Sequence, residues 1–173
     1  YFAYAHTLSG HEYVDNEDFE QAKKCYQEAL KADERHYNAW FGLGNIYHKQ
    51  ESMIKLHSTS ARQSRSTDVT NAVYLFRHHL APPKQFHEAY HSFERASTID
   101  PSNSLNEFQK AQVLLAMQQD QQALELLLKL NLQVPKEAPI HINIGKIYKK
   151  LGKLDEALKY FTRALDLDPK DIN

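Results

Sequence analysis

Three prolines of this chain are separated by a constant interval. Pro101, Pro135 and Pro169 lie 34 residues apart, and the residues before each of them keep a common spacing of small and large side chains. A repeat of this length is typical of helical pairs that stack, because one pair cannot bury its own apolar face. Proline suits the end of each second helix, since it lacks an N–H donor and restricts the residue before it. We therefore expect an all-α solenoid.

Two kinds of position recur inside the 34-residue unit. Small residues are expected where the helices of a pair approach closely, and bulky residues where neighbouring pairs meet. The small positions are Gly10, Gly44, Ala111 and Gly145 in first helices and Ala22, Ala89, Ala123 and Ala157 in second helices. The bulky positions are Tyr13, Tyr47, Phe93 and Phe161. Stacking of such pairs predicts a right-handed superhelix with a concave groove.

The register divides the chain into about five units within a single domain, residues 1–173. The predicted units are 3–36, 37–69, 70–103, 104–137 and 138–171. Residues 51–80 fit poorly, because the stretch from Ser52 to Thr70 holds eight Ser or Thr and Arg77 stands at a small position. A degenerate helical pair, an inserted segment and an erroneous gene-model translation all explain this stretch. The preserved 34-residue register favours the degenerate pair.

Composition excludes several classes of protein. Hydrophobic residues make up 42% and charged residues 25% of the chain, and five Gly and six Pro are few for a many-stranded β-protein. Twenty-one basic against 22 acidic residues give a net charge of −1, so no field attracts nucleic acid or an anionic membrane. We expect neither as a partner, and no cofactor. The absence of an initiator Met suggests an excerpt of a longer protein.

The string His87-Glu88-Ala89-Tyr90-His91 formally matches HExxH, in which two His bind zinc and the Glu activates water. The repeat places Ala89 on the buried face, so the three polar residues are expected mostly on the outer face, without a third ligand or a shielded cavity. A zinc metalloprotease is therefore a remote alternative. Cys25, the sole cysteine, is expected to be a half-buried inert thiol.

Binding is the better prospect, because polar and aromatic residues lie between the inward positions of the first helices. Amide side chains hold a peptide backbone through donor and acceptor alike, and aromatic rings add rigid apolar contact. Together they favour an extended peptide as ligand, although the same residues also suit an ordinary solvated helix face. The candidate groove residues are Tyr4, Thr7, His11, Asn38, Phe41, Asn45 and His48.

The spacing of Trp, Leu, Gly, Tyr, Ala and Pro resembles the tetratricopeptide repeat. A more specific string, RHYNAWFGLGNIYHKQE at residues 35–51, resembles the anaphase-promoting complex subunit 3 family, a part of a cell-cycle ubiquitin ligase. Three further stretches agree in order and spacing with its C-terminal repeat region: SGHEY at 9–13, VPKE at 134–137, and GKIYKKLG at 145–152 with LDLDPK at 165–170. The resemblance covers nearly the whole chain except residues 51–80.

This resemblance implies a non-catalytic scaffold whose concave groove binds the C-terminal Ile-Arg tails of co-activator and processivity subunits. It also implies other repeat subunits as partners, a possible homodimer through repeats outside this chain, and a place in the nucleus and cytoplasm. A sister repeat subunit of the same ligase, or another repeat-type peptide adaptor, remains the alternative. A two-carboxylate clamp for acidic tails is disfavoured, because it needs Lys or Arg and Asn where this chain has Thr7 and His11.

Overall fold

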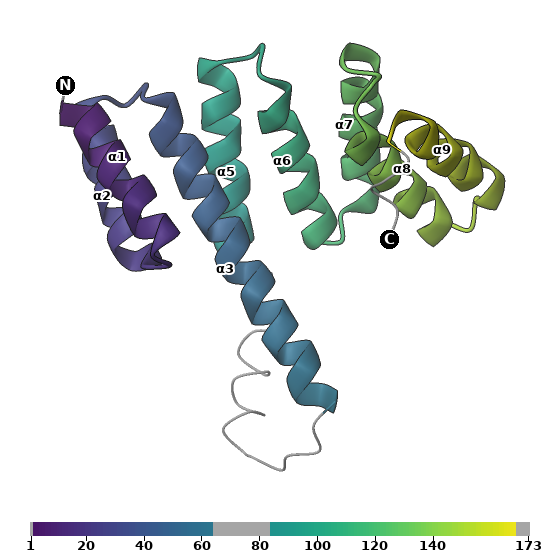
Figure 1. Cartoon of the computed structure of the whole chain (residues 1–173), viewed down its shortest axis with the longest axis horizontal. Coiled ribbons are helices and arrows are strands. Elements are labelled where there is room, and N and C mark those ends of the chain that lie inside the picture. The colour runs from purple at the N-terminus through teal and green to yellow at the C-terminus, as the bar shows by residue number, and fades with distance from the viewer. Residues whose placement is uncertain (1, 64–83, 169–173) are drawn as a thin grey trace. The chain divides into compact units, whose positions relative to one another are not determined.

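The structure is a computed structural model that describes the backbone of residues 2–63 and 84–168 and the side chains of residues 2–50 and 84–168. Within these ranges all regular secondary structure is α-helical (Figure 1). The helices are α1 (Phe2–Asp15), α2 (Phe19–Ala32), α3 (Tyr37–Gln63), α5 (Lys84–Ile99), α6 (Ser104–Ala116), α7 (Asp120–Gln133), α8 (Ala138–Lys150) and α9 (Leu154–Leu167). The prediction of an all-α fold is confirmed.

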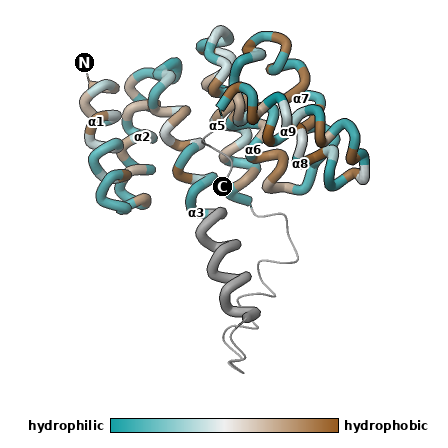
Figure 2. The backbone as a smooth tube through the Cα atoms, turned by 45° about the vertical axis from the view of Figure 1, so that its right-hand side comes forward, coloured by the Kyte–Doolittle hydropathy of each residue, from teal (hydrophilic) through white to brown (hydrophobic). Residues whose placement is uncertain are grey.

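The chain forms two compact units, Tyr1–Asp100 and Pro101–Asn173, which we describe separately. The first unit holds the pairs α1–α2 and α3–α5, and the second holds the pairs α6–α7 and α8–α9. Figure 2 shows apolar and polar residues alternating along the helices, as expected of helices that bury one face. Among the described residues no helix has the length and apolar character needed to cross a bilayer.

The predicted small positions lie at helix contacts in both units. Ala22, Ala89, Ala123 and Ala157 are all buried. A side chain built at Gly145 would come within 2.7 Å of the ring of Phe161 in the partner helix. The bulky position Tyr13 differs from the prediction, since it is 39% exposed. The ring of Tyr26 occupies the space beside Gly10 instead.

The pair α3–α5 joins residues from two of the predicted units. A carbon at Gly44 would meet the ring of Phe93 at 2.6 Å, just as one at Gly10 would meet Tyr26 at 2.5 Å. The first helix of the predicted unit 37–69 therefore packs against the second helix of the predicted unit 70–103. The small-residue surface of one repeat fits the aromatic surface of another because both keep the same register. Arg77, and the boundary predicted at residues 69 and 70, lie outside the described residues.

The turn inside three of the pairs uses one backbone conformation. Glu17, Gln118 and Gly152 have φ angles of 60°, 62° and 75°, in the left-handed region. In each turn the next N–H bonds back to a carbonyl of the preceding helix, as from Asp18 to Tyr13 at 2.8 Å and from Lys153 to Tyr148 at 2.9 Å. This is the hydrogen-bond pattern that commonly ends a helix. It reverses the chain within three residues, so the second helix packs against the first.

Candidate functional site

Two helices of the first unit carry the seven candidate groove residues. Helix α1 holds Tyr4, Thr7 and His11 at helical spacing, and α3 holds Asn38, Phe41, Asn45 and His48 in the same way. The two helices are in contact. We call the surface formed by these seven residues the α1–α3 face.

On α1 the three candidates differ in how accessible they are. Tyr4 is 59% exposed, whereas Thr7 is only 2% exposed. The hydroxyl of Thr7 donates a hydrogen bond to the carbonyl of Ala3 at 2.9 Å, so its polar group is already satisfied. Such a buried and bonded hydroxyl packs the helix and is not available to a ligand in this conformation.

His11 is exposed, and Tyr26 fixes the position of its ring. Its Nδ1 lies 2.8 Å from the hydroxyl of Tyr26, and the two rings meet edge to face. Burial of the Tyr26 ring, with a smaller contribution from the negative charge of Asp15, raises the pKa of Tyr26 to about 12. The neutral phenol therefore holds the imidazole in place at physiological pH. The Nε2 atom of His11 remains available for a ligand.

On α3 the two asparagines lie on the accessible side. Asn38 is exposed and Asn45 is half-buried. Between them Phe41 is half-buried, stacked on Tyr37 with the ring centres 5.9 Å apart and edge-on to Phe93 at 5.7 Å. The aromatic contacts fix the ring of Phe41, so it offers a rigid apolar surface between two amide groups.

The seventh candidate, His48, is the last of the four α3 residues of the α1–α3 face. It is half-buried, and its ring centre is 6.5 Å from that of Phe86 on α5. Tyr37 and Phe86 also support the face, and the repeat spacing does not indicate that role for either residue. The contribution of Phe86 depends on the contact of α3 with α5, whereas Tyr37 stacks on Phe41 one turn along the same helix.

The HExxH match lies on α5. Ala89, Phe86 and Phe93 are fully buried, while His87 and His91 are exposed. Among residues 2–50 and 84–168, no group of three or more His, Cys, Asp or Glu side chains is placed to hold a metal ion. In the described part of the chain the motif therefore has neither the third ligand nor the enclosed site that zinc catalysis needs.

Cys25 is half-buried on α2. Burial raises the pKa of its thiol, which keeps it protonated at neutral pH. A protonated thiol is a poor nucleophile.

Comparison with known proteins places the chain in a family. The tetratricopeptide repeat model matches residues 7–53 and 138–171. Anaphase-promoting complex subunit 3 of Schizosaccharomyces pombe is 36% identical over 174 residues, which covers 98% of this chain and 26% of that protein. The cell division cycle protein 27 homolog B of Arabidopsis thaliana is 39% identical over 170 residues, covering 97% of this chain and 23% of that protein.

This chain belongs to the anaphase-promoting complex subunit 3 family. A further member, from Dictyostelium discoideum, is 42% identical over 91 residues, covering 53% of this chain and 9% of its own. The chain spans about a quarter of the length of the fission yeast and Arabidopsis members.

Solved structures agree on the fold of this subunit 3 family member. A tetratricopeptide repeat protein from Parabacteroides merdae has a TM-score of 0.69 at 15% identity, covering 98% of this chain and 55% of that one. MamA from Desulfovibrio magneticus has a TM-score of 0.67 at 15% identity, covering 98% and 77%. At these identities the likeness shows the tetratricopeptide fold alone.

Proposed function

We propose that this chain is part of a non-catalytic scaffold of the anaphase-promoting complex, and that its α1–α3 face receives the C-terminal Ile-Arg tails of co-activator and processivity subunits. The observation that carries the proposal is the pair of accessible amides, Asn38 and Asn45, on either side of the fixed ring of Phe41. Membership of the subunit 3 family supports the assignment to this complex.

The side chains of the face suit an extended peptide. Each asparagine amide donates to a peptide carbonyl and accepts from a peptide N–H, while Phe41 and Tyr4 contact an aliphatic side chain such as isoleucine. Thr7 contributes by packing and does not contact the tail. Because the phenylalanine ring and the His11 imidazole are already held by neighbours, little ordering is needed on binding.

The whole scaffold has further partners in this proposal. Other repeat subunits of the complex bind it, and self-association takes place through repeats outside this chain. The complex acts in the nucleus and cytoplasm, and ubiquitin transfer belongs to other subunits. The short tail then brings its own subunit to the ligase, and contacts elsewhere add to the total affinity through effective concentration.

Tail binding is tested by fluorescence anisotropy with three labelled peptides. The first ends in Ile-Arg with a free carboxylate, the second is amidated, and in the third the arginine is alanine. We expect the first to bind the 173-residue chain and the other two to bind at least tenfold more weakly, since each loses a charge-assisted contact worth about 1.5–3 kcal/mol. Equal binding of all three would rule the tail function out.

A pair of variants locates the site. Asn38→Ala combined with Asn45→Ala is expected to lower the affinity for the free-carboxylate peptide by roughly tenfold or more, because two hydrogen bonds of about 1 kcal/mol each are lost. Gln122→Ala, an exposed amide on α7, serves as the matched control and should leave the affinity unchanged. If the double variant binds as tightly as the native chain, the tail lies on another surface.

A further inference from the structure

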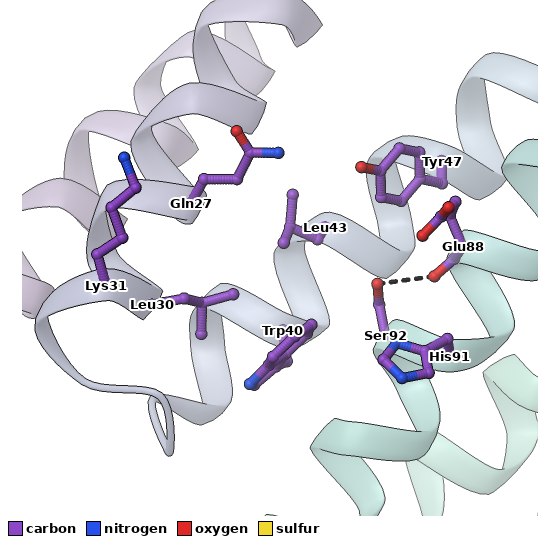
Figure 3. Close-up of a pocket in the computed structure, with 9 residues that line it drawn as sticks. All are labelled: Gln27, Leu30, Lys31, Trp40, Leu43, Tyr47, Glu88, His91 and Ser92. Carbon is purple, nitrogen blue, oxygen red and sulfur yellow. Dashed lines mark hydrogen bonds between the residues drawn. The ribbon is translucent and has the colours of Figure 1, made fainter.

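A cavity of about 390 Å³ opens between α2, α3 and α5. Its floor is the side of α3 that carries Trp40, Leu43 and Tyr47, which is a different side from the one carrying Asn38, Phe41 and Asn45. Figure 3 shows these three side chains between residues of α2 on one rim and residues of α5 on the other. The cavity is therefore separate from the proposed tail site.

Two aromatic rings of the floor are only partly covered. Trp40 and Tyr47 are half-buried, although Tyr47 stands at one of the bulky positions predicted to pack between neighbouring pairs. The indole N–H of Trp40 donates to the carbonyl of Glu34 at 2.8 Å, which fixes the orientation of the ring. The volume suits one long side chain.

Both rings already contact cations of this chain. The guanidinium of Arg95 lies 5.5 Å from the centre of the Trp40 ring, and the ammonium of Lys23 lies 5.7 Å from that of Tyr47. Arg95 does not line the cavity, and Glu34 holds its guanidinium at 2.7 Å. Both rings thus show the geometry in which aromatic faces bind positive charge.

The acidic group of the cavity is Glu88 on α5. It is half-buried beside Tyr47, and its negative charge contributes to raising the pKa of that phenol, after the larger effect of burial. Among the described residues no basic side chain lies within ion-pair distance of the Glu88 carboxylate. Across the cavity, the ammonium of Lys31 is already engaged by Glu28 at 2.6 Å. Among the described side chains that line the cavity, the Glu88 carboxylate is the charged group without an ion-pair partner.

We propose that this cavity binds an arginine side chain of a partner protein. The aliphatic stem packs on Leu30 and Leu43, the planar guanidinium stacks on an aromatic wall, and its N–H groups donate to the Glu88 carboxylate. The exposed amide of Gln27 on the α2 rim is placed to bond the backbone of the same segment. The site is thus a second docking point on the scaffold, independent of a free C-terminus.

Trp40 makes the test direct, because it is the sole tryptophan of the chain. The probes are the capped tripeptides Ala-Arg-Ala, Ala-Lys-Ala and Ala-norleucine-Ala, which have no free carboxylate and so do not depend on the tail site. We expect the arginine peptide to give a saturable change in Trp40 fluorescence and in its indole N–H signal in NMR spectra. The lysine peptide should bind more weakly, and the norleucine peptide more weakly still.

Matched variants then test the carboxylate. Glu88→Gln keeps the shape of the side chain. It should lower the affinity for the arginine peptide about fivefold or more, because a charge-assisted hydrogen bond is lost. Glu94→Gln, exposed on the same helix and outside the cavity, should bind as the native chain does. The proposal is overturned if Glu88→Gln binds unchanged or the norleucine or lysine peptide binds equally well. It is also overturned if no saturation occurs up to about 20 mM peptide.

Discussion

At the residue scale, one backbone angle decides how sharply three of the helical pairs turn. Glu17, Gln118 and Gly152 all adopt a left-handed φ at the end of the first helix. Glycine reaches this region without a steric penalty, whereas a residue with a side chain is strained by roughly 1–2 kcal/mol. Two of the three turns therefore hold strain that the third avoids.

Exchanging the side chains at this position tests that strain. Gln118→Gly is expected to raise the free energy of unfolding by about 0.5–1 kcal/mol, since relief of strain exceeds the greater freedom of glycine in the unfolded chain. Gly152→Ala is expected to lower it by about 1 kcal/mol, although no atom lies within 4 Å of the added carbon. Urea denaturation followed by circular dichroism measures both. A neutral result for Gly152→Ala would show that the turn relaxes.

Tyr26 makes the first unit sensitive to alkaline pH. Burial holds the pKa of Tyr26 at about 12, above its ordinary value of 10, so the folded state keeps its proton where the unfolded state loses it. The stabilisation is complete below pH 10 and is lost as pH rises from 10 toward 12, by up to about 3 kcal/mol. Urea unfolding followed by Trp40 fluorescence at pH 8, 10 and 11 should show this decline.

Tyr26→Phe separates this effect from general alkaline damage. The variant has no phenol to ionise, so its stability should fall less steeply above pH 10, although it starts lower because the bond to His11 is lost. Tyr4→Phe, at a ring that is 59% exposed, should follow the native profile. An unchanged slope in Tyr26→Phe would assign the alkaline loss to other groups.

At the element scale, each helix is stable only where another helix covers its apolar face. Leu124 of α7 and Leu158 of α9 occupy the same position in consecutive repeats, 34 residues apart. Helix α8 packs on α7, and Leu124 is 6% exposed. Leu158 is 66% exposed, together with Leu154 at 65%. The same residue type at the same register position thus has two environments.

Substitution of these two leucines is expected to change the free energy of unfolding by very different amounts. Leu124→Ala should lower the free energy of unfolding by about 2–4 kcal/mol, because a buried side chain is replaced by a cavity. Leu158→Ala should change it by less than about 0.5 kcal/mol, as is usual at exposed sites. Urea denaturation monitored by circular dichroism at 222 nm compares them. A large loss in Leu158→Ala would mean that another helix covers α9 in solution.

Helices α3 and α5 form a pair although a long stretch of sequence separates them. Twelve residues separate Gly10 from Ala22 and Gly145 from Ala157, while 45 separate Gly44 from Ala89. The excess of 33 residues is almost one repeat, so the small positions keep the 34-residue register on both sides, as from Gly10 to Gly44 and from Ala89 to Ala123. Periodicity alone therefore does not distinguish a pair formed by neighbouring helices from one formed across a full repeat, because both present the same complementary surfaces.

At the scale of the whole molecule, this chain corresponds to a limited part of its relatives' length. It spans about a quarter of its fission yeast and Arabidopsis relatives, which share 36% and 39% identity with it. Its net charge of −1 provides no long-range attraction for a partner. Docking to either proposed site therefore depends on local shape and on single charged groups such as Glu88.

The sequence by itself determined the helical class, the repeat type, the subunit 3 family and the small positions at helix contacts. The helical class, the repeat type and the small positions follow from periodicity and local sterics, whereas the family follows from the resemblance of residues 35–51 and three further stretches to its members. Which of the seven groove candidates remain accessible depended on tertiary packing, since Thr7 and Tyr4 follow the same helical spacing yet are 2% and 59% exposed.

Only the tertiary structure decided that α3 meets α5, that Trp40 and Tyr47 are half-covered, and that Glu88 lies beside them. Each of these facts depends on which helices meet across a long stretch of chain. That choice is made by the total burial of apolar surface and the fit of side chains between helices, and neither is encoded in any single window of residues.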